Sequence, residues 1–213
     1  MSENKKIKAV SAYVVRCKPH DIIKEDEFLK GILSVGWPSI GDLTGMTKEQ
    51  IEPIFNETWP GHGPIRLTQL YNFITIPVGS IVLTPSVYNR DVHLFLTTSG
   101  YFYNKDQDIK SPHINTSDKG NPHQIIAKFI KTVPREDFTP KLQEALNAAK
   151  RTVTNFSSYI PEIEAIVNNE PLKSVESSNI YRNEAIETLA KLLKSEDENI
   201  RLQAAINLLK AKE

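Results

Sequence analysis

The fold is indicated most directly by the stretch DVHLFLTTSGYFYN, residues 91–104, which is rich in β-branched and aromatic residues. Such residues are typical of strands. The preceding run PVGSIVLTP, residues 77–85, predicts a turn that leads into a second strand, and residues 88–91 supply the turn between the two runs. We therefore expect these two runs to pair.

Further strands and helices are predicted on both sides of this pair. VSAYVV (10–15) and QIIAKFIKTV (124–133) are apolar and β-rich, and Ser34-Val35 extends a short strand. Apolar residues at helical spacing predict helices over 21–32, 47–55 and 65–75. The second of these helices begins with a capping box, but Pro53 within it suggests a break or an early end.

The chain changes to helical character from Thr139. Apolar residues spaced by three or four predict helices over 139–169 that cover a barrel, with Val153 and Phe156 on their apolar face. A linker rich in Ser follows, and the end of the chain predicts two amphipathic helices joined by SEDEN. We expect an α+β protein: a small β-barrel with flanking helices over residues 1–169, and a linker with a C-terminal α-helical hairpin over 170–213.

The composition of the chain limits the classes of function and the cellular compartments that we expect. The 213 residues include 26 Lys+Arg and 26 Asp+Glu, so the formal net charge is zero, which argues against an all-round electrostatic nucleic-acid binder. The single cysteine, Cys17, rules out an internal disulfide framework and suits a reducing compartment. The chain has no signal-like stretch and no apolar run of membrane length, so we expect a cytoplasmic protein without a membrane partner.

Catalytic and metal-binding patterns are weak. The acidic run Glu25-Asp26-Glu27 with Lys30 is interpreted as a solvated helix face, and Cys17 with His20 has metal-ligand spacing but no second pair. The sequence has no nucleophile elbow and no phosphate-cradling glycine loop, and His62, His113 and His123 are isolated. We expect no catalytic residues, no metal and no cofactor, and therefore no enzyme.

A series of short motifs carries a family resemblance across residues 8–167. In chain order the motifs are Gly36-Trp37, Ile40-Gly41-Asp42-Leu43, Gln69-Leu70-Tyr71, Phe73, Gly79, Lys131-Thr132-Val133-Pro134-Arg135, Leu142 and Arg151-Thr152-Val153. The order and spacing resemble the domain in front of the nuclease domain of many Mrr-type restriction endonucleases, which is similar to the PUA/EVE-like small β-barrels. The resemblance implies a recognition module in a setting of restriction or phage defence.

This sequence departs from the family pattern at three places. The position after Gly79 is acidic in the family and is Ser80 here, and the family's inner Gly and Arg are missing from Leu94–Tyr101. A lost Arg changes what a pocket can hold. The nuclease domain is replaced by a hairpin that resembles one HEAT-type repeat, which cannot bury its apolar face alone.

Candidate ligand contacts centre on the loop SVGWPSIGDLTG, residues 34–45. Since an aromatic ring at the mouth of a barrel can stack on a base, Trp37 is either a base contact or a plug at the end of the barrel. Asp42 either accepts hydrogen bonds from a base or holds the loop. There are four further candidates. Trp59 either forms the wall of a pocket or anchors its loop, and the amide of Gln69 is suited to reading the edge of a base. The other two candidates are Tyr71 and Tyr101. Tyr101 and Tyr103 share one face of the strand and Phe102 the other, so one face is expected to be exposed.

Basic residues fall in two zones, and either zone could track a phosphate backbone or be ordinary surface charge. The first zone contains Lys128, Lys131, Arg135, Lys141, Lys150 and Arg151. The second zone contains Lys5, Lys6, Lys8, Arg16 and Lys18.

Three functions remain open from the sequence. The first is a non-catalytic module that binds DNA or another nucleic acid, with a modified or flipped base as one candidate ligand, while a separate effector or nuclease cleaves. The second is a sensor or sequestering protein for a small nucleotide ligand. The third is a protein-interaction adaptor, with the hairpin as its partner surface or as the contact of a homodimer.

Overall fold

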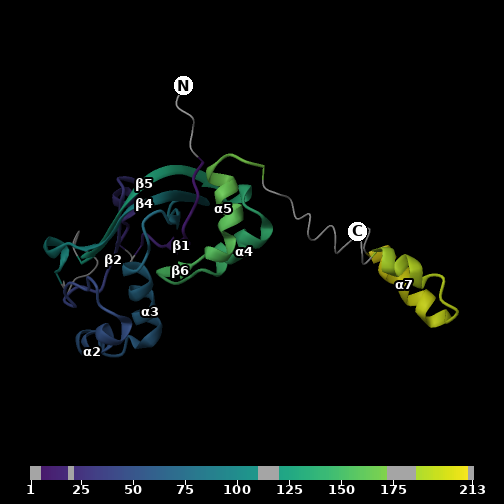
Figure 1. Cartoon of the computed structure of the whole chain (residues 1–213), viewed down its shortest axis with the longest axis horizontal. Helices are drawn as coiled ribbons and strands as arrows, with labels where there is room; N and C mark the ends of the chain where they lie inside the picture. Colours follow the sequence, from purple (N-terminus) through teal and green to yellow (C-terminus); the bar gives the residue numbers. More distant parts are fainter. Residues whose placement is uncertain (1–5, 19–21, 110–119, 172–185, 211–213) are drawn as a thin grey trace, which may run out of the picture. The chain divides into compact units, whose positions relative to one another are not determined.

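The computed structural model describes residues 6–18, 22–109, 120–171 and 186–210 (Figure 1). The chain divides into two compact units, Met1–Glu170 and Pro171–Glu213. The fold is α+β, and the first unit is built on a curled six-stranded sheet. Much of residues 105–122 and of the predicted Ser-rich linker after residue 169 falls outside the described residues. Within 105–122 the structure describes the single-turn helix η2 (Lys105–Gln107).

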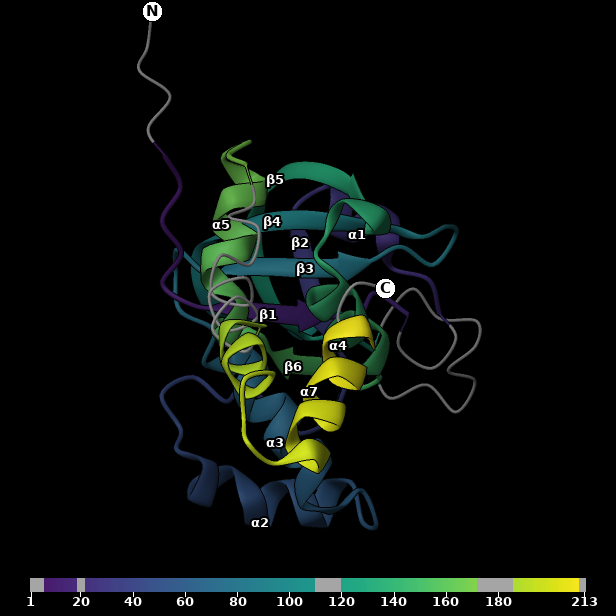
Figure 2. The same ribbon diagram turned by 90° about the vertical axis from the view of Figure 1, so that its right-hand side faces the viewer.

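The sheet has the strand order β2-β5-β4-β3-β1-β6. In Figure 2, β5, β4, β3, β1 and β6 follow one another in this order. All neighbours are antiparallel except the parallel pair β1 and β3. The strands are β1 (Ala12–Val15), β2 (Ile32–Val35), β3 (Ile81–Pro85), β4 (Asp91–Tyr103), β5 (His123–Pro134) and β6 (Val153–Asn155).

The predicted pairing of the two β-rich runs is confirmed, since Ile81 to Pro85 pair with Leu96 to Val92. The β4–β5 register shifts between Thr97 and Tyr101, where four residues of β4 span two of β5. Extra residues of this kind bend a strand and increase its twist. The long β4–β5 pair therefore curls, as Figure 1 shows.

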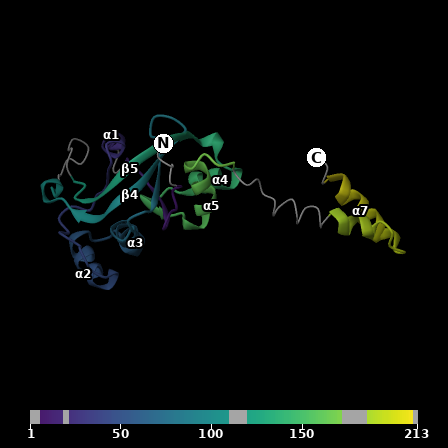
Figure 3. The ribbon, with the colours of Figure 1, turned by 45° about the horizontal axis from the view of Figure 1, so that its top comes forward.

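Two helices lie beside the curled sheet, on the side opposite the short helix α1 in Figure 3. α2 (Lys48–Thr58) begins with the predicted capping box between Thr47 and Gln50. The predicted break at Pro53 is wrong, because the helix continues to Thr58 and buries Ile51 and Phe55 on either side of the proline. α3 (Gly63–Ile74) confirms the helix predicted over 65–75.

The predicted helix over 21–32 is much shorter. α1 spans only Glu25–Leu29, and Gly31 then turns the chain with φ +92°. Ile32 was expected on the helix, but it pairs with Ile126 as the first residue of β2. Strand pairing overrides the helical spacing of the apolar residues there.

The helical segment expected after Thr139 is interrupted by a strand. α4 (Pro140–Ala148) and α5 (Ile160–Val167) flank β6, and Val153, expected on a helix, pairs with Val15. The run Thr152-Val153-Thr154 is β-branched, which disfavours a helix and favours extension of the sheet along β1. Two more single-turn helices, η4 (Arg135–Asp137) and η5 (Ser157–Tyr159), connect these elements.

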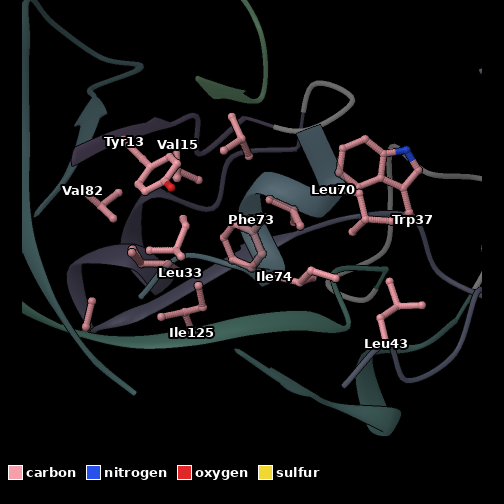
Figure 4. Packing of buried hydrophobic residues seen from close by; sticks show 14 of the residues in the cluster. Tyr13, Val15, Leu33, Trp37, Leu43, Leu70, Phe73, Ile74, Val82 and Ile125 are labelled. Atoms are coloured by element: carbon pink, nitrogen blue, oxygen red, sulfur yellow. The ribbon is translucent and has the colours of Figure 1, made fainter. Parts of the chain in front are cut away.

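The main core lies between the sheet and helices α2 and α3. Phe28, Phe55, Phe73 and Phe95 are fully buried in it. Figure 4 shows Trp37 beside Leu70 at one end of this cluster, with the indole nitrogen directed away from Phe73. The core thereby anchors the loop that follows β2.

The second unit contains a helix over residues 186–192 and α7 (Glu198–Lys210). Asp197 caps α7, because its carboxylate accepts a hydrogen bond of 2.8 Å from the backbone N–H of Asn199. Ala204 is buried, whereas Leu192, Leu193 and Leu202 are 41%, 40% and 57% exposed. No helix in the described ranges is both long enough and apolar enough to span a membrane.

Candidate functional site: a basic pocket

A strongly basic pocket lies where α3 approaches the edge of the sheet. Its volume is about 430 Å³. Among the described residues that line it, five are Lys or Arg and none is Asp or Glu, although the whole chain has equal numbers of acidic and basic residues. The lining residues are Arg16, Lys18, Gly36, Trp37, His62, Arg66, Gln69, Lys150, Arg151 and Thr152.

The pocket is built from segments that are far apart in the sequence. Arg16 and Lys18 follow β1, and Arg66 lies in the first turns of α3. Lys150 and Arg151 lie in the turn before β6. The antiparallel pairing of β1 with β6 places the end of β1 beside the start of β6. The N-terminus of α3 adds the positive end of a helix dipole to these charges.

Hydrogen bonds fix the basic turn before β6. The backbone N–H of Thr152 donates to Gln69 Oε1 at 2.7 Å, and the backbone N–H of Arg16 donates to the Thr152 carbonyl at 2.9 Å. Arg16 also donates from Nε to the Ala149 carbonyl at 2.9 Å. Gln69 is buried, and its amide nitrogen donates to the Ile65 carbonyl at 3.4 Å. The turn that carries Lys150 and Arg151 is therefore held on both sides.

The loop at the opposite wall is strained. Trp37 and Ser39 have φ of +65° and +69°, in the left-handed region that side chains other than glycine rarely adopt. Trp59 Nε1 donates to the Pro38 carbonyl at 3.0 Å, and the Trp37 carbonyl lies 3.3 Å from His123 Nε2. Contacts from outside the loop thus maintain a conformation that costs about 1–3 kcal/mol per strained residue.

Trp37 lies at the end of the core and also lines the basic pocket. Its side chain is packed in the core, with its ring centroid 6.4 Å from that of Phe55, and it is only 9% exposed. The small exposed part lines the basic pocket. The indole therefore closes the end of the core and does not offer a full face for stacking.

Three of the predicted site residues meet in this pocket, and the other ligand candidates do not line it. Trp37, Gln69 and Arg151 are brought together. Asp42 is exposed and accepts hydrogen bonds from the N–H and hydroxyl of Thr44, which holds its own loop. Tyr71 packs against the core.

Trp59 and Tyr101 support the strained loop and the residues after it. The Trp59 ring lies 4.8 Å from that of His62. The Tyr101 hydroxyl accepts a hydrogen bond from the Leu43 N–H at 3.3 Å and lies 3.0 Å from His123 Nδ1. His123, an isolated histidine in the sequence, is fully buried in β5, and burial lowers its pKa to about 4, so that the ring is neutral. Neither face of β4 is exposed here, since Tyr101, Phe102 and Tyr103 are all half-buried.

Three further predicted phosphate contacts, Lys128, Lys131 and Arg135, lie outside the pocket. Lys128 is exposed on β5, and Lys131 Nζ donates to Asn169 Oδ1 at 2.8 Å and also to the Ile166 carbonyl. Arg135 donates to Asn147 Oδ1 at 2.7 Å. Burial, and then the nearby charges of Arg90 and Arg16, lower the pKa of Arg135.

Sequence reasoning missed Arg66 and the meeting of the two basic zones. Arg16 and Lys18 come from the N-terminal zone, whereas Lys150 and Arg151 come from the other. Arg66 was unremarkable as an isolated basic residue on a predicted helix. The only available signal was its position on the first turns of a helix that follows a Gly/Pro-rich loop.

A second polar cluster is buried and structural. Glu25, expected on a solvated face, is 4% exposed, and its Oε1 lies 2.8 Å from His93 Nε2. Glu25 also accepts hydrogen bonds from the Ser86 hydroxyl at 2.8 Å and the Val87 N–H at 2.7 Å. Cys17 Sγ lies 3.8 Å from Glu25 Oε2, whereas His20 lies outside the described residues.

Cys17 is expected to be chemically inert in the folded protein. Burial and then the Glu25 charge raise the pKa of its thiol to about 12. Because the thiolate is the nucleophile, we expect alkylation by iodoacetamide at neutral pH to be at least about a hundredfold slower than in urea-unfolded protein. Mass spectrometry against time measures both rates. Equal rates in folded and unfolded protein would contradict the burial of Cys17.

Comparisons with known proteins leave the site to be interpreted from its own residues. No family model matches the sequence, and no curated protein matches it. One similar solved structure is the YTH domain of the Zygosaccharomyces rouxii MRB1 protein in complex with N6-methyladenosine RNA, at 13% identity and a TM-score of 0.39, covering 76% of this chain and 90% of that chain. Within the described ranges, no group of three or more His, Cys, Asp or Glu residues is placed to hold a metal ion.

Proposed function

We propose that the unit Met1–Glu170 is a non-catalytic nucleic-acid-binding module that holds phosphate groups in its basic pocket. The observation that carries the proposal is the convergence of five Lys and Arg residues on one hollow of about 430 Å³, with no acidic residue among the described residues that line it. Lys and Arg contacts to phosphates supply most of the sequence-independent affinity for nucleic acids. The defence setting, with a separate effector or nuclease, is a further part of this proposal and is supported by the family resemblance alone.

The binding surface is local, which reconciles the proposal with a net charge of zero. A protein of balanced charge has no long-range attraction for nucleic acid, but a concentrated basic site still binds phosphates at short range. Since Trp37 is nine-tenths buried, we do not propose that a base stacks on its ring. The strand is held through its phosphates, and any base selectivity comes from other contacts.

A small nucleotide is the second candidate ligand. Pockets for small ligands typically have volumes of about 300–1,000 Å³, and this pocket falls in that range. A small ligand also requires no long basic track, which suits the zero net charge. Both candidates place phosphate in the same pocket.

The test measures binding of short fluorescent DNA and RNA strands by anisotropy at about 50 and about 200 mM salt. The double variant Arg66→Gln, Arg151→Gln removes two pocket charges. We expect its affinity to fall at least about tenfold and its log–log salt slope to decrease by about 1–2, because two phosphate contacts are lost.

The matched control is Lys30→Gln, Lys128→Gln, which removes the same charge from exposed positions outside the pocket. We expect nearly unchanged binding and the wild-type salt slope. The proposal is wrong if no strand binds, or if the control variant loses affinity and the pocket variant does not. Lys128 was itself a candidate phosphate contact, so the second result would place the strand along β5.

A further inference from the structure

The arrangement of the five cations bears on the kind of phosphate that the pocket takes. They come from three separate segments, the end of β1, the start of α3 and the turn before β6, and all five line one hollow. The interior of a strand presents one negative charge per phosphodiester, spaced along the backbone. A row of single cations matches that pattern, but a cluster matches charge that is concentrated in one place.

A terminal phosphate has this concentrated charge. A phosphomonoester carries about −1.5 to −2 charge at neutral pH and offers three strong acceptor oxygens. A di- or triphosphate carries more charge in the same space. Arg side chains suit such groups because the guanidinium donates two parallel hydrogen bonds, and three of the five cations are Arg16, Arg66 and Arg151.

Hydrogen bonds within the protein already hold residues of the pocket wall in place before a phosphate group binds. Arg16 is fixed by its Nε hydrogen bond to Ala149, and Thr152 is fixed by Gln69 and by the backbone of Arg16. Holding like charges together costs folding free energy. A bound dianion would reduce this repulsion more than the single charge of a phosphodiester does.

We propose that the pocket is a receptor for a terminal phosphate or oligophosphate, supplied either by the phosphorylated end of a nucleic-acid strand or by a free nucleotide. This inference deepens the proposed function and shares its pocket. The shared chemistry is a phosphate group with more than one negative charge, which is surrounded by Arg and Lys donors.

The experiment compares one oligothymidylate carrying a 3′ fluorophore in three forms: with a 5′ hydroxyl, a 5′ phosphate, or a 5′ phosphate capped as a methyl ester. The ester has nearly the size of the phosphate but one charge fewer. A fourth strand with a 3′ phosphate and a 5′ fluorophore tests the other end. We expect a phosphorylated end to bind about tenfold more tightly than the hydroxyl and ester forms, and this advantage to disappear in Arg66→Gln, Arg151→Gln.

Competition by thymidine mono-, di- and triphosphate and by pyrophosphate separates the two sources. If the free nucleotides bind but no strand does, and the pocket variant abolishes their binding, the phosphate receptor stands and the nucleic-acid proposal fails. If all strands bind equally and the pocket variant still weakens them, the nucleic-acid proposal stands and this inference is overturned. An end-phosphate advantage that survives in the pocket variant also overturns it.

Discussion

Replacing Glu25 by alanine is expected to lower the free energy of unfolding by about 3–5 kcal/mol, the cost of removing one member of a buried polar network. The carboxylate contacts His93, the Ser86 hydroxyl and the Val87 N–H, each within 2.8 Å. Alanine leaves these groups buried without their partner, and each orphaned group costs about 1–3 kcal/mol. Urea unfolding followed by circular dichroism measures the change, with an unaltered m-value showing that the unfolded state is the same.

The matched control is Asp26→Ala, the next residue of α1, whose side chain is exposed. A surface substitution of this kind changes stability by about 0.5 kcal/mol or less. If the two variants were equally stable, the network around Glu25 would not contribute to stability.

The same network predicts a dependence on pH. Burial acts to raise the pKa of Glu25, but hydrogen bonds from Val87, His93 and Ser86 outweigh it, and the pKa of Glu25 lies below its usual range. A group with a lowered folded pKa stabilises the protein above its unfolded pKa, and that contribution is lost as the pH falls through the folded pKa. The stability difference between wild type and Glu25→Ala should therefore be full at neutral pH and shrink in acid below about pH 4.

Local pattern predicted the parts of the fold in which neighbouring residues decide the structure. The strands over 77–85, 91–104 and 124–133 follow from β-branched and aromatic runs, and the start of α2 follows from the Thr47 capping box. The pattern failed at Ile32 and Val153, whose partners Ile126 and Val15 are distant in the sequence. There, pairing with another strand outweighed local helical spacing.

The candidate site was less accessible to sequence reasoning because its residues meet only after folding. Arg16, Arg66 and Arg151 belong to segments separated by at least one strand or helix, and of the three only Arg151 lies in a motif of the family resemblance. Glu25 was misread for the same reason, since an acidic run looks solvated until His93 is placed beside it. The amide of Gln69 gave one local signal, because a mostly apolar helix face with one amide needs a partner for it.

Gly31→Ala is the second variant for which we expect a large effect. Gly31 ends the turn between α1 and β2 at φ +92°, and a Cβ there would lie 2.5 Å from the carbonyl oxygen of Ala127. That oxygen belongs to the backbone of β5, and the Ala127 N–H is bonded to the Gly31 carbonyl at 2.9 Å, so the strand cannot easily move away. We expect the free energy of unfolding to fall by about 3 kcal/mol or more, from backbone strain and the clash together.

Gly45→Ala separates these two causes. Gly45 has φ +74°, but a Cβ there has no atom within 4 Å, so it adds only the strain of about 1 kcal/mol or slightly more. The difference between the variants, measured by urea unfolding, is the cost of pushing β2 away from β5. Because β2 leads directly into Gly36 and Trp37, the same displacement would reach the wall of the basic pocket and weaken phosphate binding in the folded Gly31→Ala protein. Equal losses of stability in both variants would show instead that β2 and β5 adapt to the added methyl group, and binding should then be unaffected.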